Sequence, residues 1–451
     1  MTESLNFSAI ILAAGKGTRM KSDIPKVLHK VAGLEMIFHV INAAQSAGVS
    51  HTTIVTSPIQ LDLRDNILAK ASDYNLTMAV QEQQLGTGDA VKAALPLAGN
   101  PDKVLILFGD TPLMRPDVLQ QMVGDSSDIT LLGFMTDTPD GYGRIICEDG
   151  KPIAIIEHKD ADEETRHIKL CNGGALAVNA TLLPDLLNGL ENNNAQSEYY
   201  LPDIVRLAHA QNISIGLVVC QQEDTLGVDT KTGLAKAEAL MQNRLRQKHL
   251  DNGVSMTAPE TVYFSYDTQI GPDSSIEPHC IFGVDVKIAS EVTIKGFSHL
   301  EGVLAETGVQ IGPYARLRQG TRLGAGAKIG NFVETKKAQI MEDAKVNHLS
   351  YIGDAYIGEG ANIGAGTITC NYDGYDKHLT EIGAGAFIGS NSSLIAPVKI
   401  GDGAYIGSSS SISGEIEAES LALTRAPLKE IEGWSVKFRM KKTKTDEAKD
   451  K

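Results

Sequence analysis

The most constraining feature of this chain is an apolar side chain that recurs every six residues through its C-terminal part. A helix repeats every 3.6 residues and a strand every two, so neither produces this period. Such a period is typical of a parallel β-helix, in which each short strand points one apolar side chain into a narrow core. We therefore expect a β-helix domain at residues 252–451. The recurring residues are Ile270, Ile276, Phe282, Ile288, Ile294, Ile311, Leu317, Leu323, Ile329, Ile340, Val346, Ile352, Ile357, Ile363, Ile382, Ile388, Leu394, Ile400, Ile406 and Ile412.

A polar, aromatic-bearing insert interrupts this repeat at residues 370–378. Lys336, His348, Tyr351 and Asn362 precede it, and packing alone does not explain so polar a set. A β-helix also presents flat exposed faces that can serve only to assemble subunits, because architecture does not imply chemistry. Two interpretations therefore remain open for this domain, a scaffold and an active site.

The N-terminal part begins with an apolar run at residues 6–14 that fits a buried parallel strand and leads into the sequence AAGKGTRM. A glycine-rich turn after a strand can close its N–H groups on a phosphate, and Lys16 and Arg19 add positive charge. The turn is not G-x-G-x-x-G, because Met20 replaces the third glycine, and it lacks the G-K-[ST] end of a P-loop. Phosphate binding and a plain strand-to-helix turn both remain possible on this spacing.

A second apolar strand at residues 104–108 ends in Gly109 and Asp110. In open α/β sheets, ligands bind at the carboxyl ends of the strands, which is where Asp110 occurs. A carboxylate at this position can hold Mg²⁺ against phosphate groups. Asp110 is therefore our first candidate metal ligand.

Residues 230–250 form the clearest predicted helix, with an apolar stripe of Leu234, Ala237, Met241 and Leu245. We expect a domain at 1–228, a linker helix at 229–251 and the β-helix domain at 252–451, whose lysine-rich end from residue 437 is a solvated tail. The net charge of −15 makes broad nucleic-acid binding unexpected. Five cysteines without CxxC spacing, no membrane-length apolar run and no signal sequence indicate a cytoplasmic protein.

The N-terminal motifs together resemble the sugar-1-phosphate nucleotidyltransferase family. The resemblance implies a Rossmann-like α/β domain with a mixed, mostly parallel sheet, and Mg²⁺-assisted transfer of a nucleotide to a sugar phosphate. The motifs are LAAGKGTRM at 12–20, PK at 25–26, Q-x4-GTG at 81–88, GD at 109–110, GYGR at 141–144, EHKDA at 157–161, NGG at 172–174 and EYYLPD at 198–203.

The same resemblance implies the roles of individual residues. Lys26 would neutralise charge on the α-phosphate, and Asp110 and Asp229 would bind the metal ion. Asp229 replaces an expected asparagine and Phe108 an expected tyrosine, so the metal affinity and one hydroxyl contact differ from the family pattern. The nucleotide and nucleotide-sugar contacts implied are Leu12, Ala13, Ala14, Gly15, Lys16, Arg19, Lys26, Gln81, Gly86, Thr87, Phe108, Gly109, Asp110, Gly143, Glu157, Asn172 and Asp229.

The C-terminal polar motifs closely resemble the acetyltransferase half of a family of bifunctional bacterial enzymes, the N-acetylglucosamine-1-phosphate uridylyltransferases/glucosamine-1-phosphate acetyltransferases. The resemblance implies that the C-terminal domain is a left-handed parallel β-helix and that the chain assembles as a homotrimer. With the N-terminal motifs, the resemblance spans nearly the whole chain. The motifs are RLRQG at 316–320, GNFVETKKA at 330–338, NHLSYIGDA at 347–355, NIGAGTITCNYDG at 362–374 and IGSN at 388–391.

By that resemblance His348 is the general base for acetyl transfer, a task that imidazole suits near neutral pH. Glu334 would orient it and Lys377 would complete the sugar site. The implied contacts to the sugar phosphate are Arg318, Lys336, Tyr351 and Asn362. The implied contacts to acetyl-CoA are Ala365, Asn371, Tyr372, Ser390, Ser408 and Arg425.

The favoured hypothesis is therefore one chain with two activities. It would acetylate glucosamine-1-phosphate with acetyl-CoA and then transfer UMP from UTP to N-acetylglucosamine-1-phosphate, giving UDP-N-acetylglucosamine and pyrophosphate. Two alternatives remain: a nucleotidyltransferase whose β-helix only forms a trimer, and a sensor of nucleotide sugars without catalysis. The choice of UTP over dTTP rests on the resemblance alone.

Overall fold

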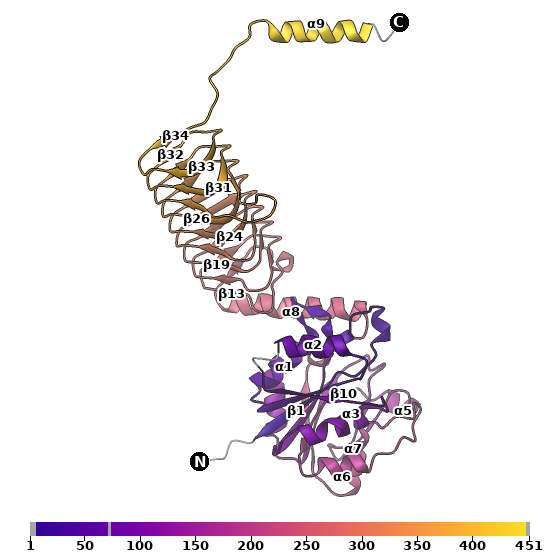
Figure 1. Ribbon diagram of the computed structural model, residues 1–451. Helices are drawn as coiled ribbons and strands as arrows, with labels where there is room; N and C mark the ends of the chain where they lie inside the picture. Colours follow the sequence, from indigo (N-terminus) through magenta and orange to yellow (C-terminus); the bar gives the residue numbers. More distant parts are fainter. Residues whose placement is uncertain (1–5, 71–73, 448–451) are drawn as a thin grey trace. The chain divides into compact units, whose positions relative to one another are not determined.

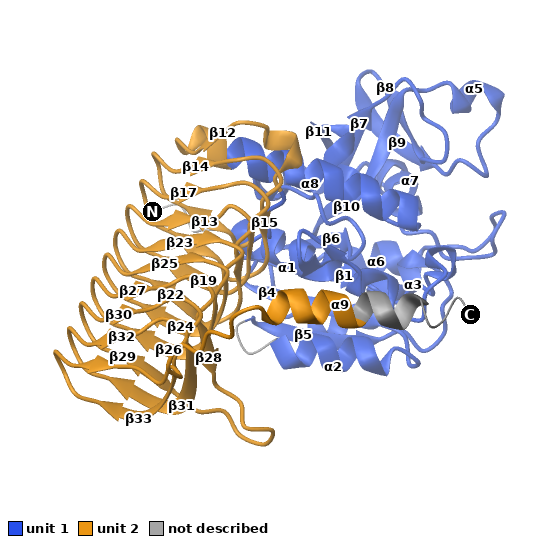
Figure 2. Ribbon diagram, turned by 90° about the horizontal axis from the view of Figure 1, so that it is seen from above, with its two compact units in different colours: residues 1–248, 263–266 blue, residues 249–262, 267–451 orange. Residues whose placement is uncertain are grey.

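The computed structural model describes residues 6–70 and 74–447 and divides the chain into two compact units (Figure 1). The α/β unit comprises residues 1–248 and 263–266, and the β-helix unit comprises residues 249–262 and 267–451 (Figure 2). Each unit is described by itself below.

The main sheet of the α/β unit has the strand order β11-β7-β10-β6-β1-β4-β5. Only β10 runs antiparallel to its neighbours in this path, so the predicted mixed, mostly parallel sheet is confirmed. The antiparallel pair β8 and β9 is attached through β10, and β2 pairs with β3 separately. The strands are β1 (Phe7–Leu12), β2 (Lys30–Val31), β3 (Leu34–Glu35), β4 (His51–Thr56), β5 (Leu76–Val80), β6 (Lys103–Phe108), β7 (Ile129–Met135), β8 (Arg144–Glu148), β9 (Lys151–Ile156), β10 (Leu170–Asn179) and β11 (Ile215–Cys220).

Strand β1 shows why this sheet forms, since all six of its residues are buried. Its side chains alternate between two cores: Ala9 and Ile11 join residues of α1, α2 and α4, while Ile10 and Leu12 join residues of α3, α6 and α7. A sheet covered on both faces requires such a continuous apolar strand. The helices are α1 (Met36–Ser46), α2 (Leu61–Lys70), α3 (Thr87–Ala94), α4 (Pro116–Gly124), α5 (Glu163–Arg166), α6 (Leu183–Asn188) and α7 (Asp203–Ala210).

Helix α8 (Lys231–Asp251) forms where the sequence predicts the linker helix. Its stripe residue Ala237 is buried in a small core with Val228 and Leu113, and Leu234 and Met241 pack against that core. Arg244 fixes the helix further, because its Nη2 lies 2.6 Å from the buried carboxylate of Asp224. Helix α8 therefore belongs to the α/β unit up to residue 248.

The β-helix unit is built from parallel strands of mostly two or three residues, each paired with a strand one coil away. Ile294 pairs in register with Ile276 and Ile311, so side chains of one type stack along the axis. Every apolar residue of the six-residue repeat is buried, which confirms the predicted parallel β-helix and is consistent with the left-handed form.

Its strands belong to two connected sets. The first contains β12 (Ser255–Met256), β14 (Ser275–Ile276), β17 (Thr293–Ile294), β20 (Gln310–Ile311), β23 (Lys328–Asn331), β25 (Lys345–His348), β27 (Asn362–Ile363), β30 (Phe387–Ile388), β32 (Tyr405–Ile406) and β34 (Leu421–Ala422). The second contains β13 (Gln269–Ile270), β15 (Ile281–Phe282), β16 (Lys287–Ile288), β18 (His299–Leu300), β19 (Val303–Ala305), β21 (Arg316–Leu317), β22 (Thr321–Leu323), β24 (Glu334–Ile340), β26 (Tyr351–Ile357), β28 (Ile368–Cys370), β29 (Thr380–Ile382), β31 (Ser393–Ile400) and β33 (Ser411–Ile416).

The insert that interrupts the repeat is ordered by its own contacts between β28 and β29. The Asp373 carboxylate accepts hydrogen bonds from the N–H groups of Tyr375 and Asp376 and lies 2.7 Å from Nε2 of His378. Asn371 at its base donates to Asp354 at 2.5 Å. The insert is therefore a defined loop on the side of the β-helix.

The lysine-rich C-terminal segment contains helix α9 (Trp434–Glu447), which the sequence interpretation as a tail did not anticipate. Its described side chains, up to Lys441, are exposed, as expected for a solvated segment. No helix within residues 6–70 and 74–447 combines the length and the apolar character needed to cross a bilayer. All five cysteines are free.

Candidate active sites

The first candidate site is a pocket of about 530 Å³ at the carboxyl ends of β1 and β6. Leu12 and Phe108 are register partners at the ends of these strands, so the glycine-rich turn and Gly109–Asp110 leave the sheet side by side. Of the residues implied by the resemblance, the pocket is lined by Leu12, Ala13, Ala14, Gly15, Lys16, Arg19, Lys26, Gln81, Gly86, Thr87, Phe108, Asp110 and Asp229. Gly109 does not line this pocket, but its N–H donates to the carbonyl of Leu12 at 2.9 Å and so joins the ends of β1 and β6.

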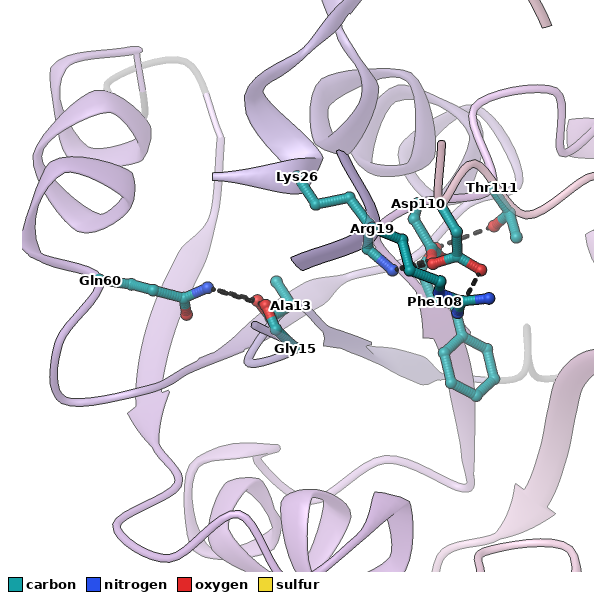
Figure 3. Close-up of polar contacts among 9 residues, drawn as sticks. Ala13, Gly15, Arg19, Lys26, Gln60, Phe108, Asp110 and Thr111 are labelled. Atoms are coloured by element: carbon teal, nitrogen blue, oxygen red, sulfur yellow. Dashed lines mark hydrogen bonds and ion pairs between the residues drawn. The ribbon is translucent and has the colours of Figure 1, made fainter. Parts of the chain in front are cut away.

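Two glutamines that the sequence interpretation missed donate hydrogen bonds to the backbone of the glycine-rich turn. Gln60 donates through Nε2 to the carbonyls of Ala13 and Gly15, both at 3.3 Å (Figure 3), and Gln84 donates to the carbonyl of Ala14. Within the turn, Gly17 has a φ of 61°, and a Cβ there would lie 2.8 Å from the Cβ of Lys26. Glycine at this position therefore lets the chain carrying Lys26 pass close to the turn.

Lys26 contacts both candidate metal ligands, and its contact with Asp110 is drawn in Figure 3. Its Nζ is 2.5 Å from Oδ2 of Asp110 and 2.8 Å from Oδ1 of Asp229, and Arg19 Nη2 is 2.8 Å from Oδ2 of Asp229. Burial lowers the pKa of Lys26, but the two carboxylates outweigh burial and raise it above its ordinary value. The N–H of Val228 donates to the carbonyl of Asp110 at 3.0 Å, which joins the two segments.

This pair of carboxylates fits a magnesium ion by the chemistry of its donors. Mg²⁺ prefers oxygen ligands and is commonly held by one or two carboxylates, with substrate phosphates and water completing its shell. Asp110 and Asp229 are already close enough to share one ammonium group. Across the described residues there is no group of three or more histidine, cysteine, aspartate or glutamate side chains that could hold a metal. The pair therefore suits an ion that also binds phosphate.

A second pocket of about 330 Å³ adjoins the first, since Thr87, Phe108 and Glu198 line both. It contains the predicted Gly143, Glu157 and Asn172. These converge because the N–H of Asn172 donates to the carbonyl of Gly143 at 2.8 Å and the Glu157 carboxylate lies against Gly143. The two pockets give room for two connected groups.

The second pocket carries acidic and phenolic groups in a poorly solvated setting. Burial, and then the charges of Asp160 and Asp203, raise the pKa of Glu157. Burial and nearby carboxylates raise the pKa of Tyr200 to about 12. The Tyr200 hydroxyl is buried without a hydrogen-bond partner in the described structure, which leaves it available to a polar ligand group. The EYYLPD motif contained Tyr200, but sequence alone did not single it out.

The third candidate site lies on the β-helix around His348 at the end of β25. Nδ1 of His348 is 2.6 Å from Oδ1 of Asn331, its register partner on β23. An amide oxygen only accepts hydrogen bonds, so Nδ1 is the donor in this contact, and in the neutral ring Nε2 keeps a lone pair for a substrate. The sequence interpretation missed Asn331, although it lies one coil before the histidine.

Cationic side chains gather on the neighbouring face. Arg318 pairs with Glu334 at 2.9 Å, and Glu334 is the register partner of Tyr351. The charge of Lys377, followed by that of Arg318, lowers the pKa of Lys336. The structure thus brings together four of the predicted residues, Arg318, Glu334, Lys336 and Lys377, into a cluster with excess positive charge.

The residues expected at acetyl-CoA fall into two groups. Along one corner, the N–H of Asn391 donates to the carbonyl of Ala365, and that of Ser409 to the carbonyl of Ser390, so Ala365, Ser390 and Ser408 follow one another on successive coils. Gly407, beside Ser408, faces Arg425. Asn362 begins β27, just before this corner. In contrast, the side chains of Asn371 and Tyr372 bond to Asp354 and to the carbonyl of Gly374 within the same chain.

Comparison with known proteins gives matches to both units. The model of the MobA-like NTP transferase domain matches residues 9–166, and that of the bacterial transferase hexapeptide (six repeats) matches residues 379–414. The "Bifunctional protein GlmU" of Parvibaculum lavamentivorans is 52% identical over 437 residues, which cover 96% of each chain. That of Azorhizobium caulinodans is 48% identical over 436 residues, covering 95% of this chain and 96% of the relative. This chain belongs to the GlmU family.

GlmU membership confirms the resemblance that the sequence motifs predict. The match to the GlmU protein of Zymomonas mobilis covers 98% of this chain and 100% of the relative at 47% identity, so it includes both units and the connecting helix. The two domain models fall in different units. The name given to these GlmU relatives, a bifunctional protein, agrees with the separate sites described above.

Proposed function

We propose that this chain is a bifunctional enzyme that acetylates glucosamine-1-phosphate with acetyl-CoA and then joins the product to UMP from UTP. The final products would be UDP-N-acetylglucosamine and pyrophosphate. The observation that carries the proposal is GlmU membership over nearly the whole chain, together with an intact polar site in each unit. A chain with one activity would not need both sites.

For nucleotidyl transfer, the first pocket would hold the nucleoside triphosphate and the second the sugar phosphate. A phosphate oxygen of the sugar attacks the α-phosphorus, a new P–O bond forms, and the bond to pyrophosphate breaks. Lys16, Arg19 and Lys26 bring three positive charges to the pocket, which stabilise negative charge in the transition state. Bound Mg²⁺, held by Asp110 and Asp229, would neutralise phosphate charge.

For acetyl transfer, Nε2 of His348 would accept a proton from the amine of glucosamine-1-phosphate as the nitrogen attacks the thioester carbonyl. A C–N bond forms, the C–S bond breaks, and the departing sulfur takes up the proton that His348 accepted, which gives the thiol of coenzyme A. The Asn331 carbonyl keeps the other ring proton on Nδ1. The positive cluster of Arg318, Lys336 and Lys377 suits the sugar phosphate.

We also propose that the enzyme is a cytoplasmic homotrimer. The hexapeptide-repeat match and an exposed aromatic strip support assembly. In that strip Phe297, Tyr314 and Phe332 stack at 4.9 and 5.2 Å along one corner of the β-helix, with about half of each side chain exposed. A second chain packed on such a strip would remove apolar surface from water. The side chains of Asn371 and Tyr372 form hydrogen bonds within their own chain. A neighbouring chain would then supply further contacts to acetyl-CoA.

The test uses purified protein with glucosamine-1-phosphate, acetyl-CoA, UTP and Mg²⁺, and mass spectrometry of all sugar products over time. We expect N-acetylglucosamine-1-phosphate to appear first and UDP-N-acetylglucosamine to follow. Formation of the nucleotide sugar only from ready-made N-acetylglucosamine-1-phosphate would contradict the acetyl-transfer half and favour a β-helix that only assembles subunits.

A further prediction concerns the tautomer of His348. In an Asn331→Ala variant, the ring loses the one hydrogen bond that it makes within residues 6–70 and 74–447, and we expect kcat for acetyl transfer to fall about tenfold. The ¹⁵N chemical shifts of the His348 ring, measured by NMR, should change from one tautomer to a mixture of two.

The matched variant for this prediction is Asn331→Asp, which keeps an oxygen acceptor at the same distance from the ring. It should keep a single tautomer and retain most of the activity. If Asn331→Ala leaves the ring shifts unchanged, Asn331 does not fix the tautomer.

A further inference from the structure

Gln81, which follows β5 and lines the first pocket, has an amide group whose orientation is fixed by its neighbours. Its side chain is 4% exposed. Nε2 donates to the carbonyl oxygen of Gly86 at 3.0 Å and to Oδ2 of Asp89 at 2.7 Å. An amide nitrogen has two hydrogens, so both are used. Turning the amide over would place its oxygen against two groups that only accept hydrogen bonds.

Because its nitrogen is engaged, Gln81 can offer a ligand only its oxygen. In the described structure Oε1 of Gln81 accepts no hydrogen bond, and Gln81 shares the pocket with Leu12, Ala14 and Thr87. The pocket therefore presents a hydrogen-bond acceptor to whatever base occupies it. A base that donates at the facing position gains a hydrogen bond, and a base with a lone pair there meets repulsion.

Asp89 is held in place by the backbone around it. It lies in the first turn of α3, where the N–H of Gly88 donates to the carbonyl of Tyr199 at 2.8 Å. The N–H of Tyr199 in turn donates to the carbonyl of Leu85 at 2.8 Å. A Cβ at Gly88 would lie 2.4 Å from Leu190 Cδ1, so this turn is closely packed. The carboxylate is therefore a fixed partner for the amide.

We propose that Asp89 is a specificity-determining residue that selects the pyrimidine base by holding the oxygen of Gln81 toward it. Uracil carries a hydrogen on N3, which Oε1 can accept, whereas N3 of cytosine carries a lone pair. The site would therefore take a uridine nucleotide and disfavour a cytidine nucleotide. The inference rests on the proposed nucleotidyl transfer and deepens it.

The carboxylate contributes more to this selection than the carbonyl of Gly86. A hydrogen bond to an ionised acceptor is roughly twice as strong as one between neutral groups. Without Asp89, only the Gly86 carbonyl would oppose rotation of the amide, and the rotated amide could donate to N3 of cytosine. The loss of Asp89 should thus improve the binding of cytosine nucleotides relative to uracil nucleotides.

The test compares UTP as substrate with CTP as competitive inhibitor in pyrophosphate release from wild-type protein and variants. We expect Asp89→Ala to lower the ratio of the CTP inhibition constant to the UTP KM by about tenfold. Asp89→Asn keeps an oxygen acceptor and should retain most of the ratio. Asp185→Ala removes an exposed acidic residue from the first turn of α6 and is the control for loss of a helix N-terminal charge.

A purely structural role for Asp89 would weaken UTP and CTP equally and leave the ratio unchanged, which would overturn the inference. If the Asp89→Ala variant folds poorly, Asp89→Leu takes its place in the test. Leucine fills a similar space without a hydrogen-bond acceptor and should show the same change of ratio. Failure of wild-type protein to use UTP at all would instead contradict the proposed function, so the two failures can be told apart.

Discussion

Replacing His348 by alanine is expected to reduce acetyl transfer to glucosamine-1-phosphate by about 10² to 10⁴-fold, the usual contribution of a general base. The reason is that Nε2 is the one basic atom that the hydrogen bond from Nδ1 to Asn331 leaves ready for a substrate amine. Release of the coenzyme A thiol measures this reaction. Pyrophosphate release from UTP and N-acetylglucosamine-1-phosphate should stay within about twofold of wild type, because His348 belongs to the β-helix unit and lines neither pocket of the α/β unit.

The control for this prediction is His299→Ala, which removes another exposed, outward-facing histidine from the same β-helix. It should leave both reactions near wild type. His348→Ala protein that keeps more than a tenth of its acetyl transfer would contradict the assignment of the base. If no variant in the cationic cluster affects acetyl transfer either, the β-helix would be a scaffold only.

The sequence predicted the β-helix well because its signal is local and repeated. A coil brings a residue back to the same face after about three six-residue repeats, 18 residues from Ile276 to Ile294 and 17 from Ile294 to Ile311, so the period indicates which side chains enter the core. Ile276, Ile294 and Ile311 illustrate this, since they are buried and stack in register. The end of β6 at Phe108 was predictable in the same way, from an apolar run followed by glycine, whereas the run at residues 6–14 extends two residues past the observed end of β1 at Leu12.

Contacts between residues distant in sequence were not predictable from these patterns. Lys26 bridges two carboxylates that are 84 and 203 residues further along the chain. Antiparallel β10 lies between β6 and β7, an order that no local signal encodes. Asn331 faces His348 across one coil of 17 residues, whereas Ile276 and Ile294 are 18 residues apart, so a fixed spacing does not identify this pair.

Two departures from the family pattern in the α/β unit show how a resemblance and a structure complement each other. Resemblance identified Asp229 as an unusual carboxylate near the metal. The structure shows that this extra negative charge is balanced by Arg19 and Lys26 at 2.8 Å each. Phe108 keeps its ring against Gly174, where it lines both pockets of the α/β unit. With both substitutions, the site keeps the carboxylates, the cationic side chains and the aromatic ring that the proposed chemistry uses.

The second large effect is expected for Asp110→Asn, which should lower transfer of UMP by about 10² to 10³-fold, the loss typical of one electrostatic group at a transition state. Asparagine has nearly the same shape, so the loss would come from the missing charge. Lys26 would lose its closest counter-ion, at 2.5 Å, and the carboxylate pair proposed for Mg²⁺ would lose one member. Pyrophosphate release measures the reaction, and acetyl transfer should stay near wild type.

Magnesium dependence separates this explanation from a general defect. If Asp110 binds the ion, Asp110→Asn protein should need more Mg²⁺ for half-maximal rate, and Mg²⁺ with UTP should raise its melting temperature less than that of wild type. Asp117→Asn is the matched control, because Asp117 is a half-exposed aspartate paired with Arg115 away from the pocket lining. It should leave the magnesium requirement unchanged. An unchanged requirement in Asp110→Asn would mean that Asp110 acts only as the counter-ion of Lys26, and Asp229 would then be left as the metal ligand of this site.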